Sequence, residues 1–107
     1  METITPRLLA ELASIGWLPR DYVEWIEQNG CGRIGDDEYM IYGGVVPLSE
    51  IQPGAPANLW TFGDDFSGYN GCFELDGDGI VVEWDSATWA AEPTGQRFPD
   101  FIARWRK

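Results

Sequence analysis

The chain has 107 residues, of which 44% are hydrophobic and 14% are aromatic, and its 18 acidic and 7 basic residues give a formal net charge of −11 at pH 7 with no histidine. This length and composition predict one globular domain spanning residues 1–107 and exclude disordered, collagen-like and low-complexity classes. Because a strongly anionic surface repels nucleic acid and anionic membranes, neither is an expected partner.

Two helices are expected at the start of the chain. Thr5 supplies an N-cap hydroxyl, Pro6 suits the first helical position, and apolar residues then recur at helical spacing up to a stop at Gly16. A second helix should begin at Leu18-Pro19 and end at Asn29-Gly30. Its buried side is predicted to carry Tyr22, Val23 and Ile26.

After Gly30 the pattern changes to short runs rich in β-branched and aromatic residues. The runs cover 31–34, 38–42, 45–48, 59–62, 72–75 and 80–84, and they predict strands of an antiparallel or mixed sheet. The segment 49–58 is expected to be a loop with a helical turn at 49–51, and 85–95 is also interpreted as a loop.

The end of the chain predicts a helix that begins near Pro99. Its apolar residues Phe98, Phe101, Ile102 and Trp105 follow the i, i+3, i+4, i+7 spacing of one helix face. The predicted fold class is therefore α+β, a mostly antiparallel β-sheet with N-terminal helices and a C-terminal helix packed against it.

The register of one hairpin can be worked out from its turn. A turn centred on Gly77-Asp78 pairs Leu75 with Ile80, Phe73 with Val82 and Gly71 with Trp84, so that the bulky apolar residues share one face. The opposite face then collects Cys72 and Val81 with four carboxylates, those of Glu74, Asp76, Glu83 and Asp85. This acidic stripe is either an ordinary solvated sheet face or a binding face for a cationic partner.

The residue types argue against catalysis and cofactor binding. No glycine-rich phosphate loop occurs, and the absence of histidine removes the commonest general base and metal ligand, so we expect no enzyme, no catalytic residue and no cofactor. The run Asp76-Gly77-Asp78-Gly79 resembles the opening of a calcium loop, but Ile80 and Ala87 stand where further ligands are needed. A turn explains the run better, and no metal site is expected.

Two cysteines, Cys31 and Cys72, without a CxxC spacing are interpreted as small hydrophobic residues. The chain has no apolar run of membrane-spanning length and no leader-like N-terminus, which predicts a cytoplasmic location. Tyr69 and Trp89 have no assigned buried position, and aromatic residues beside acidic ones are typical of interface hot spots, although single exposed aromatics are also common by chance.

Several motifs in a fixed order carry a family resemblance. They are Leu18-Pro19-x-Asp21-Tyr22, Asn29-Gly30, Phe62-Gly63-Asp64-Asp65 with Gly68, Cys72-Phe73-Glu74-Leu75, Val81-Val82-Glu83-Trp84-Asp85 and Phe98-Pro99-Asp100-Phe101-Ile102. From about residue 18 to residue 105 the chain resembles the SUKH superfamily, in particular its Smi/Knr branch. The resemblance implies helices packed against a mostly antiparallel sheet and implies no catalytic residues; the family's polar loop positions match Asp64, Asp65 and Gly68.

Many bacterial members of that superfamily look like immunity proteins that bind and block a polymorphic toxin, often a nuclease or a nucleic-acid deaminase, whereas fungal relatives act as regulatory interaction proteins. We therefore expect an immunity protein whose partner is a cognate toxin domain with a basic surface, because an anionic face associates fast with such a surface. The alternative is a regulatory or scaffold module. The candidate partner-binding residues are Asp64, Asp65, Tyr69, Glu74, Asp76, Glu83, Asp85 and Trp89.

Overall fold

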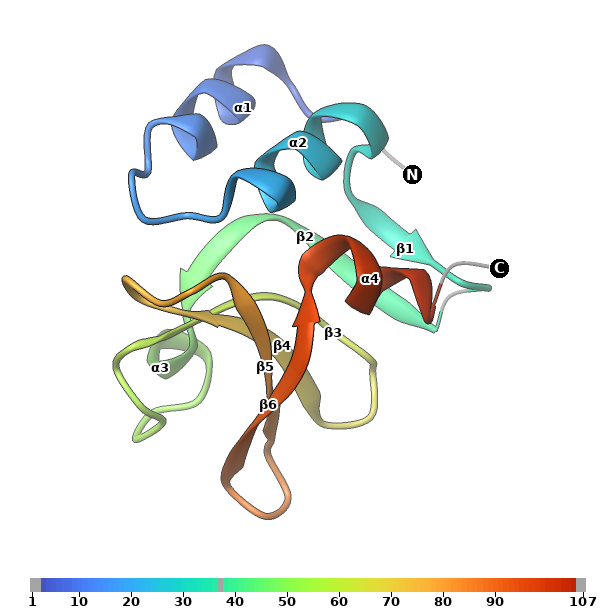
Figure 1. Ribbon diagram of the computed structural model, residues 1–107. Helices are drawn as coiled ribbons and strands as arrows, with labels where there is room; N and C mark the ends of the chain where they lie inside the picture. The colour runs from blue at the N-terminus through green and yellow to red at the C-terminus, as the bar shows by residue number, and fades with distance from the viewer. Residues whose placement is uncertain (1–2, 37, 106–107) are drawn as a thin grey trace.

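The structure, a computed structural model, describes residues 3–36 and 38–105. Four helices and six strands occur in these residues (Figure 1). In chain order they are α1 (Pro6–Ala13), α2 (Arg20–Asn29), β1 (Gly32–Ile34), β2 (Tyr39–Pro47), α3 (Leu48–Ile51), β3 (Leu59–Asp64), β4 (Tyr69–Glu74), β5 (Ile80–Asp85), β6 (Ala90–Arg97) and α4 (Phe98–Ala103).

The strands form one sheet in the order β1-β2-β3-β4-β5-β6, and each neighbouring pair is antiparallel. Consecutive strands are thus neighbours throughout, which is the arrangement that short connections favour in antiparallel sheets. Together with the terminal helices this confirms the predicted α+β class.

The two N-terminal helices lie close to their predicted positions. The hydroxyl of Thr5 accepts a hydrogen bond from the N–H of Leu8 at 3.2 Å, and Pro6 is the first helical residue. The helix ends at Ala13, three residues before the predicted stop, since Ser14 already caps it. Helix α2 buries Tyr22, Val23 and Ile26 as predicted and ends at Gly30, whose φ of 80° favours glycine.

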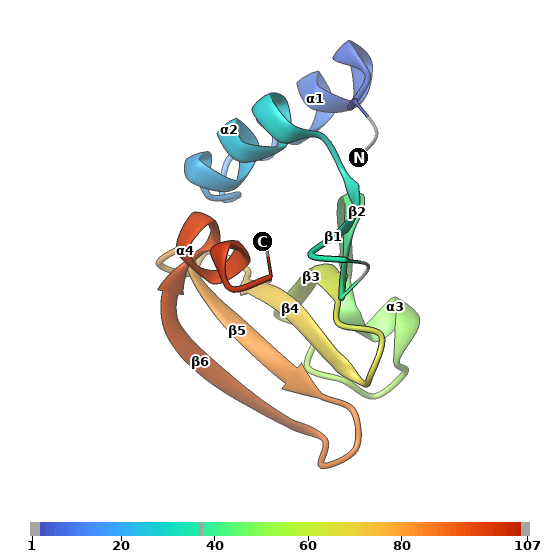
Figure 2. The same ribbon diagram turned by 90° about the vertical axis from the view of Figure 1, so that its right-hand side faces the viewer.

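Helices α1, α2 and α4 lie on one face of the sheet, as Figures 1 and 2 show. Phe98, the first residue of α4, is the centre of this core: its ring lies 4.9 Å from those of Tyr22 and Phe62 and 5.3 Å from that of Trp25. Phe101 and Ile102 are also fully buried, which confirms the predicted apolar face of the C-terminal helix.

A second, smaller apolar cluster lies on the opposite face of the sheet. Its members are Leu48, Ala55, Leu59, Cys72, Val82 and Trp84. Leu48 comes from α3 and Ala55 from the segment that follows it, so the predicted loop at 49–58 with its helical turn covers this face. The indole N–H of Trp84 donates to the side-chain oxygen of Gln52 at 2.7 Å and ties that segment to β5. The middle of the sheet is therefore buried on both faces.

Strand β6 corrects the prediction of a loop at 85–95. Ala90–Arg97 pairs with β5, with Glu83 opposite Glu92 and Asp85 opposite Ala90. Its residues are mostly exposed and include Pro93 and Gly95. An edge strand has a neighbour on one side only, so it tolerates a proline and needs no alternation of apolar residues. For these two reasons the sequence of β6 does not indicate a strand.

Candidate functional site

The β4–β5 hairpin differs from the predicted register by one residue. Asn70 pairs with Trp84, Gly71 with Glu83 and Cys72 with Val82. The chain reverses earlier than predicted, because the N–H of Gly77 donates to the carbonyl of Glu74 at 2.9 Å and places Leu75 and Asp76 at the centre of the turn. Asp76 has a φ of 57°, a conformation that aspartate tolerates better than most residues.

This shift divides the carboxylates that were predicted to form one stripe. Glu83 and Asp85 follow the buried Val81 at intervals of two residues, so they lie on the same face as Val81, the face that α1, α2 and α4 cover. Glu74 lies on the other face beside Leu59 and Val82. Asp76 lies in the turn at the far end of the hairpin. The predicted acidic stripe is therefore wrong: a sheet buried on both faces needs apolar residues on both sides of this hairpin, and a one-residue slip provides them.

What the structure brings together is a smaller group around the turn end of the β5–β6 hairpin. A hollow of about 100 Å³ is lined by Tyr69, Glu83, Asp85, Thr88, Ala90 and Glu92. Both ribbon views show this hairpin projecting away from α1 and α2 (Figures 1 and 2). Tyr69, Glu83 and Asp85 belong to the predicted set, and Thr88 and Glu92 join them.

Asp85 is held in its ionised form by the turn that follows it. The backbone N–H of Ala87 donates to Asp85 Oδ1 at 2.9 Å, and this hydrogen bond, with further ones from Thr88, lowers the pKa of the carboxyl. The negative charge of Asp85 in turn raises the pKa of the Tyr69 phenol, which stays protonated at neutral pH. The hollow thus presents an anion beside a hydroxyl.

Only part of the hollow's charge is neutralised within the fold. Arg104 Nη2 lies 3.5 Å from Glu83 Oε1, and its guanidinium lies 4.5 Å from the centre of the Phe101 ring. In residues 3–36 and 38–105 no basic side chain forms an ion pair with Asp85 or Glu92. Glu92 is exposed, so its charge is available to a partner.

Asp64 and Asp65 build the β3–β4 turn. Asp65 Oδ1 accepts from the N–H groups of Ser67 and Tyr69 at 2.9 and 3.1 Å. Asp64 accepts from the N–H of Phe66 at 2.9 Å through one oxygen and from the Tyr42 hydroxyl at 2.5 Å through the other. These half-buried carboxylates fix the turn that positions Tyr69, and a contact of their own with a partner stays a prediction.

Tyr69 and Trp89 are both exposed, by 42% and 49% of their surface. They lie on different faces: Tyr69 lines the hollow, whereas Trp89 packs edge-on against Trp84 with ring centroids 5.0 Å apart. Trp84 belongs to the cluster on the opposite face. The two aromatic residues therefore do not form one patch with the acidic hollow.

Thr88, Ala90 and Glu92 are the residues of the hollow that the candidate set lacks. Each depends on recognising strand β6, since Glu92 lies opposite Glu83 only through that pairing. The turn-forming residues 85–88 after β5 were the one signal that a further strand follows. Asp37, one of the acidic residues of the basic-free stretch between Arg33 and Arg97, lies outside the described residues.

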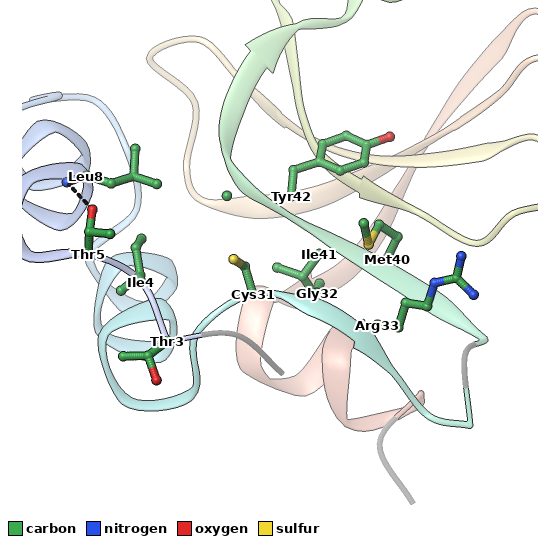
Figure 3. Close-up of a pocket in the computed structure, with 11 residues that line it drawn as sticks. Thr3, Ile4, Thr5, Leu8, Cys31, Gly32, Arg33, Met40, Ile41 and Tyr42 are labelled. Atoms are coloured by element: carbon green, nitrogen blue, oxygen red, sulfur yellow. Dashed lines mark hydrogen bonds between the residues drawn. The ribbon is translucent and has the colours of Figure 1, made fainter.

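A second concave feature lies beside the short edge strand β1. This groove of about 820 Å³ runs between residues 3–8 and the β1–β2 pair, with Ile4 and Leu8 on one wall and Cys31 and Ile41 on the other (Figure 3). It contains none of the candidate partner-binding residues. Its one charged lining residue is Arg33, which also lies 5.1 Å from the centre of the Phe66 ring.

In the part of the chain that the structure describes, no three cysteine, aspartate or glutamate side chains are grouped so that they could hold a metal ion. No helix within the same residues is both long and apolar enough to cross a membrane. Comparisons with protein-family models, curated proteins and solved structures give no match to this chain.

Proposed function

We propose that this chain is a non-enzymatic protein-binding domain that acts as an immunity protein and neutralises a cognate toxin with a basic surface. The observation that carries the proposal is the hollow at the turn end of the β5–β6 hairpin, where Asp85 and Glu92 lack an ion-pair partner in the described residues and lie beside the exposed Tyr69. The resemblance to the Smi/Knr branch of the SUKH superfamily supplies the biological role.

The charge of the whole chain supports the same reading. A protein with a net charge of −11 attracts a basic partner over long range, and opposite charges raise association rates well above the range of about 10⁵–10⁶ M⁻¹s⁻¹ typical of neutral surfaces. Toxins that act on nucleic acid need a basic groove for the phosphate backbone. An inhibitor with an exposed anionic surface is suited to cover such a groove.

A regulatory or scaffold module that binds a host protein is the alternative. The observation that favours it is the apolar groove between residues 3–8 and the β1–β2 pair, which offers a surface for a partner that is not basic. The two functions differ in the partner: an immunity protein has one whose expression alone is toxic.

The test is capture followed by rescue. The immobilised protein is exposed at low salt to lysate of its own source, and the proteins that elute with rising salt are identified and expressed alone and together with this chain. We expect one stoichiometric partner that is toxic alone and harmless in coexpression. An assortment of weakly held basic proteins, or a partner without toxicity, would contradict the immunity role and favour the alternative.

Two matched charge reversals locate the interface on that partner complex. Glu92→Lys and Glu74→Lys change the same residue type at exposed positions on opposite faces of the sheet. We expect Glu92→Lys to weaken binding by tenfold or more, in line with about 1.4 kcal/mol, and to make it less sensitive to salt. Glu74→Lys should change affinity far less. The reverse order would place the interface on the other face.

A further inference from the structure

The groove between residues 3–8 and the β1–β2 pair is lined in part by bare backbone. Gly32 and Gly43 both belong to its lining, and a glycine presents only main-chain atoms to a groove. A Cβ added to Gly43 would lie 3.5 Å from Leu8 Cδ2 and 3.9 Å from Cys31 Sγ, which belong to facing walls (Figure 3). The absence of a side chain at this position therefore keeps the groove open.

Neither backbone conformation nor core packing requires glycine at position 43. Gly43 does not adopt the left-handed φ that favours glycine, and both contacts of an added Cβ would be ordinary van der Waals distances. Glycine in the interior of a strand costs conformational entropy and contributes no side chain to packing. A glycine that the fold does not need, in the wall of a groove, is typical of a place where another backbone approaches closely.

The same stretch of β2 has no neighbouring strand. Ile41 pairs with Gly63 of β3 and Val46 pairs with Thr61, while the pairing of β1 with β2 ends at Ile41. In the described part of the chain, residues 42–45 therefore pair with neither β1 nor β3. A strand segment at the edge of a sheet can hydrogen-bond through its main chain to an added extended peptide, which is a common mode of peptide recognition.

Arg33 determines the charge that the groove attracts. It is the one charged residue of the lining, its side chain is exposed, and no ion pair joins it to a carboxylate within residues 3–36 and 38–105. Figure 3 shows it at the end of the groove away from Leu8. Because acidic residues outnumber basic ones by 18 to 7, most of the surface repels a carboxylate, whereas this end of the groove attracts one.

We propose that this groove binds an extended apolar peptide segment of a partner protein, with a carboxylate of the segment at Arg33. The segment hydrogen-bonds through its main chain to β2, its apolar side chains contact Leu8 and Ile41, and its carboxylate meets the guanidinium, whose planar fork matches both oxygens. The volume of about 820 Å³ lies within the range of about 300–1,000 Å³ of ligand-binding pockets. This inference rests on the alternative function, whose partner it characterises, and it does not involve the acidic hollow.

The test uses the full chain and two synthetic peptides. Isotope-labelled protein is titrated with the acetylated and amidated hexapeptide Thr-Val-Ile-Val-Glu-Thr and followed by amide chemical shifts. We expect saturable shifts centred on Leu8, Cys31, Arg33 and Gly43. The same peptide with lysine in place of glutamate should bind at least about threefold more weakly. The net charge of −11 favours the lysine peptide elsewhere on the surface, so this order of affinities separates the groove from general attraction.

Matched variants test the two features that define the site. Gly43→Ala places a methyl group between the walls and should weaken binding of the glutamate peptide about threefold or more, with little change in stability. Gly44→Ala is its control, because the added Cβ would contact Leu12, which does not line the groove. Arg33→Gln should abolish the preference for glutamate over lysine, and Arg7→Gln, on the exposed surface of α1, should retain it.

Three results would overturn the proposal: no saturable shift, equal or tighter binding of the lysine peptide, or an equal loss of binding in Gly43→Ala and Gly44→Ala. Sodium decanoate, which has a carboxylate and an apolar chain but no peptide backbone, is the third probe. Binding of decanoate in the groove without binding of the peptide would assign the site to an amphipathic acid and refute the peptide.

Failure of this site is distinguishable from failure of the immunity role, because the groove and the acidic hollow share no residue. A captured toxic partner without peptide binding would refute the groove site alone. Peptide binding together with capture of a non-toxic partner would refute the immunity role alone.

Discussion

Glycine at position 71 permits a close approach of aromatic side chains to the sheet. Gly71 lies between its cross-strand partners Gly63 and Glu83, and the space that its side chain would fill is taken by the ring of Phe62 and the hydroxyl of Tyr39. Without a Cβ at this point the aromatic core reaches the sheet surface directly beside the acidic hollow. The glycine is thus a packing requirement of the core.

Replacing Gly71 should therefore destabilise the fold. A Cβ at this position would lie 2.5 Å from Phe62 Cζ, so we expect Gly71→Ala to lower the free energy of unfolding by about 1–3 kcal/mol through overpacking. Gly43→Ala is the control, because its Cβ would be 3.5 Å from Leu8 Cδ2, an ordinary contact, and we expect a change within about 0.5 kcal/mol. Urea unfolding measures the free energy of unfolding of both variants. An equal loss of stability in the two would contradict the close contact expected between the added Cβ at position 71 and Phe62.

At the level of single residues, part of the candidate site follows from the sequence. The exposure of Tyr69 and the ionised state of Asp85 depend on residues close to them in the sequence, so short-range sequence patterns can indicate both. The position of Glu92 does not, since that residue joins the site only through the pairing of β6 with β5. Side chains that meet across several strands leave no spacing signal in the chain.

Among the elements, helix α4 joins the terminal part of the chain to the sheet. Its first residue, Phe98, packs at 4.9 Å from the rings of Tyr22 in α2 and Phe62 in β3, and its last turn brings Arg104 to Glu83. The helix therefore closes the core, and Arg104 at its end pairs with Glu83, which lines the hollow. The pattern of apolar residues predicted this element because a helix that covers a core repeats its buried face at a regular spacing.

Truncating this ring tests the role of α4 in the core. We expect Phe98→Ala to cost about 3–5 kcal/mol of unfolding free energy, because the site is fully buried among other aromatic rings, and Phe98→Leu to cost clearly less. Leu75→Ala is the control at a residue with 42% of its surface exposed, with an expected change below about 1 kcal/mol. Denaturant unfolding ranks the stabilities of the three variants. A loss of unfolding free energy in Leu75→Ala as large as that in Phe98→Ala would contradict the central place of Phe98 in the core.

The hairpin β4–β5 shows why strand existence is easier to predict than register. Apolar alternation at 72–75 and 80–84 indicated both strands, but the turn at Asp76-Gly77-Asp78-Gly79 allows reversal at more than one position. The register observed puts Phe73 and Val81 into one core and Cys72, Val82 and Trp84 into the other. That choice depends on the elements that cover the two faces, the terminal helices on one face and α3 with the segment after it on the other.

Across the whole molecule, like charge opposes folding. The net charge of −11 is carried largely by a stretch with no basic residue between Arg33 and Arg97. The ion pairs in the described residues draw on Arg7, Arg97 and Arg104, so the exposed carboxylates of the middle stretch repel one another. The same charge that would steer a basic partner is therefore a cost to stability.

Screening should recover part of that cost. Between about 0.01 M and about 0.1 M sodium chloride the Debye length falls from about 30 Å to about 10 Å, so we expect the melting temperature at pH 7 to rise by several degrees. The double variant Glu50→Gln/Asp76→Asn removes two exposed negative charges and should melt higher at low salt with a smaller rise. A melting temperature that falls as salt is added would show that attractive ion pairs dominate.

The α+β class, the helix caps, the C-terminal helix and the anionic character follow from the sequence by itself, because each depends on residues within a few positions or on composition. The tertiary structure decided the register of β4–β5, the existence of β6 and the meeting of Tyr69, Glu83 and Glu92 around one hollow. These features arise because the sheet is buried on both faces in its middle and on neither at the β6 edge. Which face of a strand is buried depends on helices and loops that are distant in the sequence. Local sequence patterns contain no information about that burial.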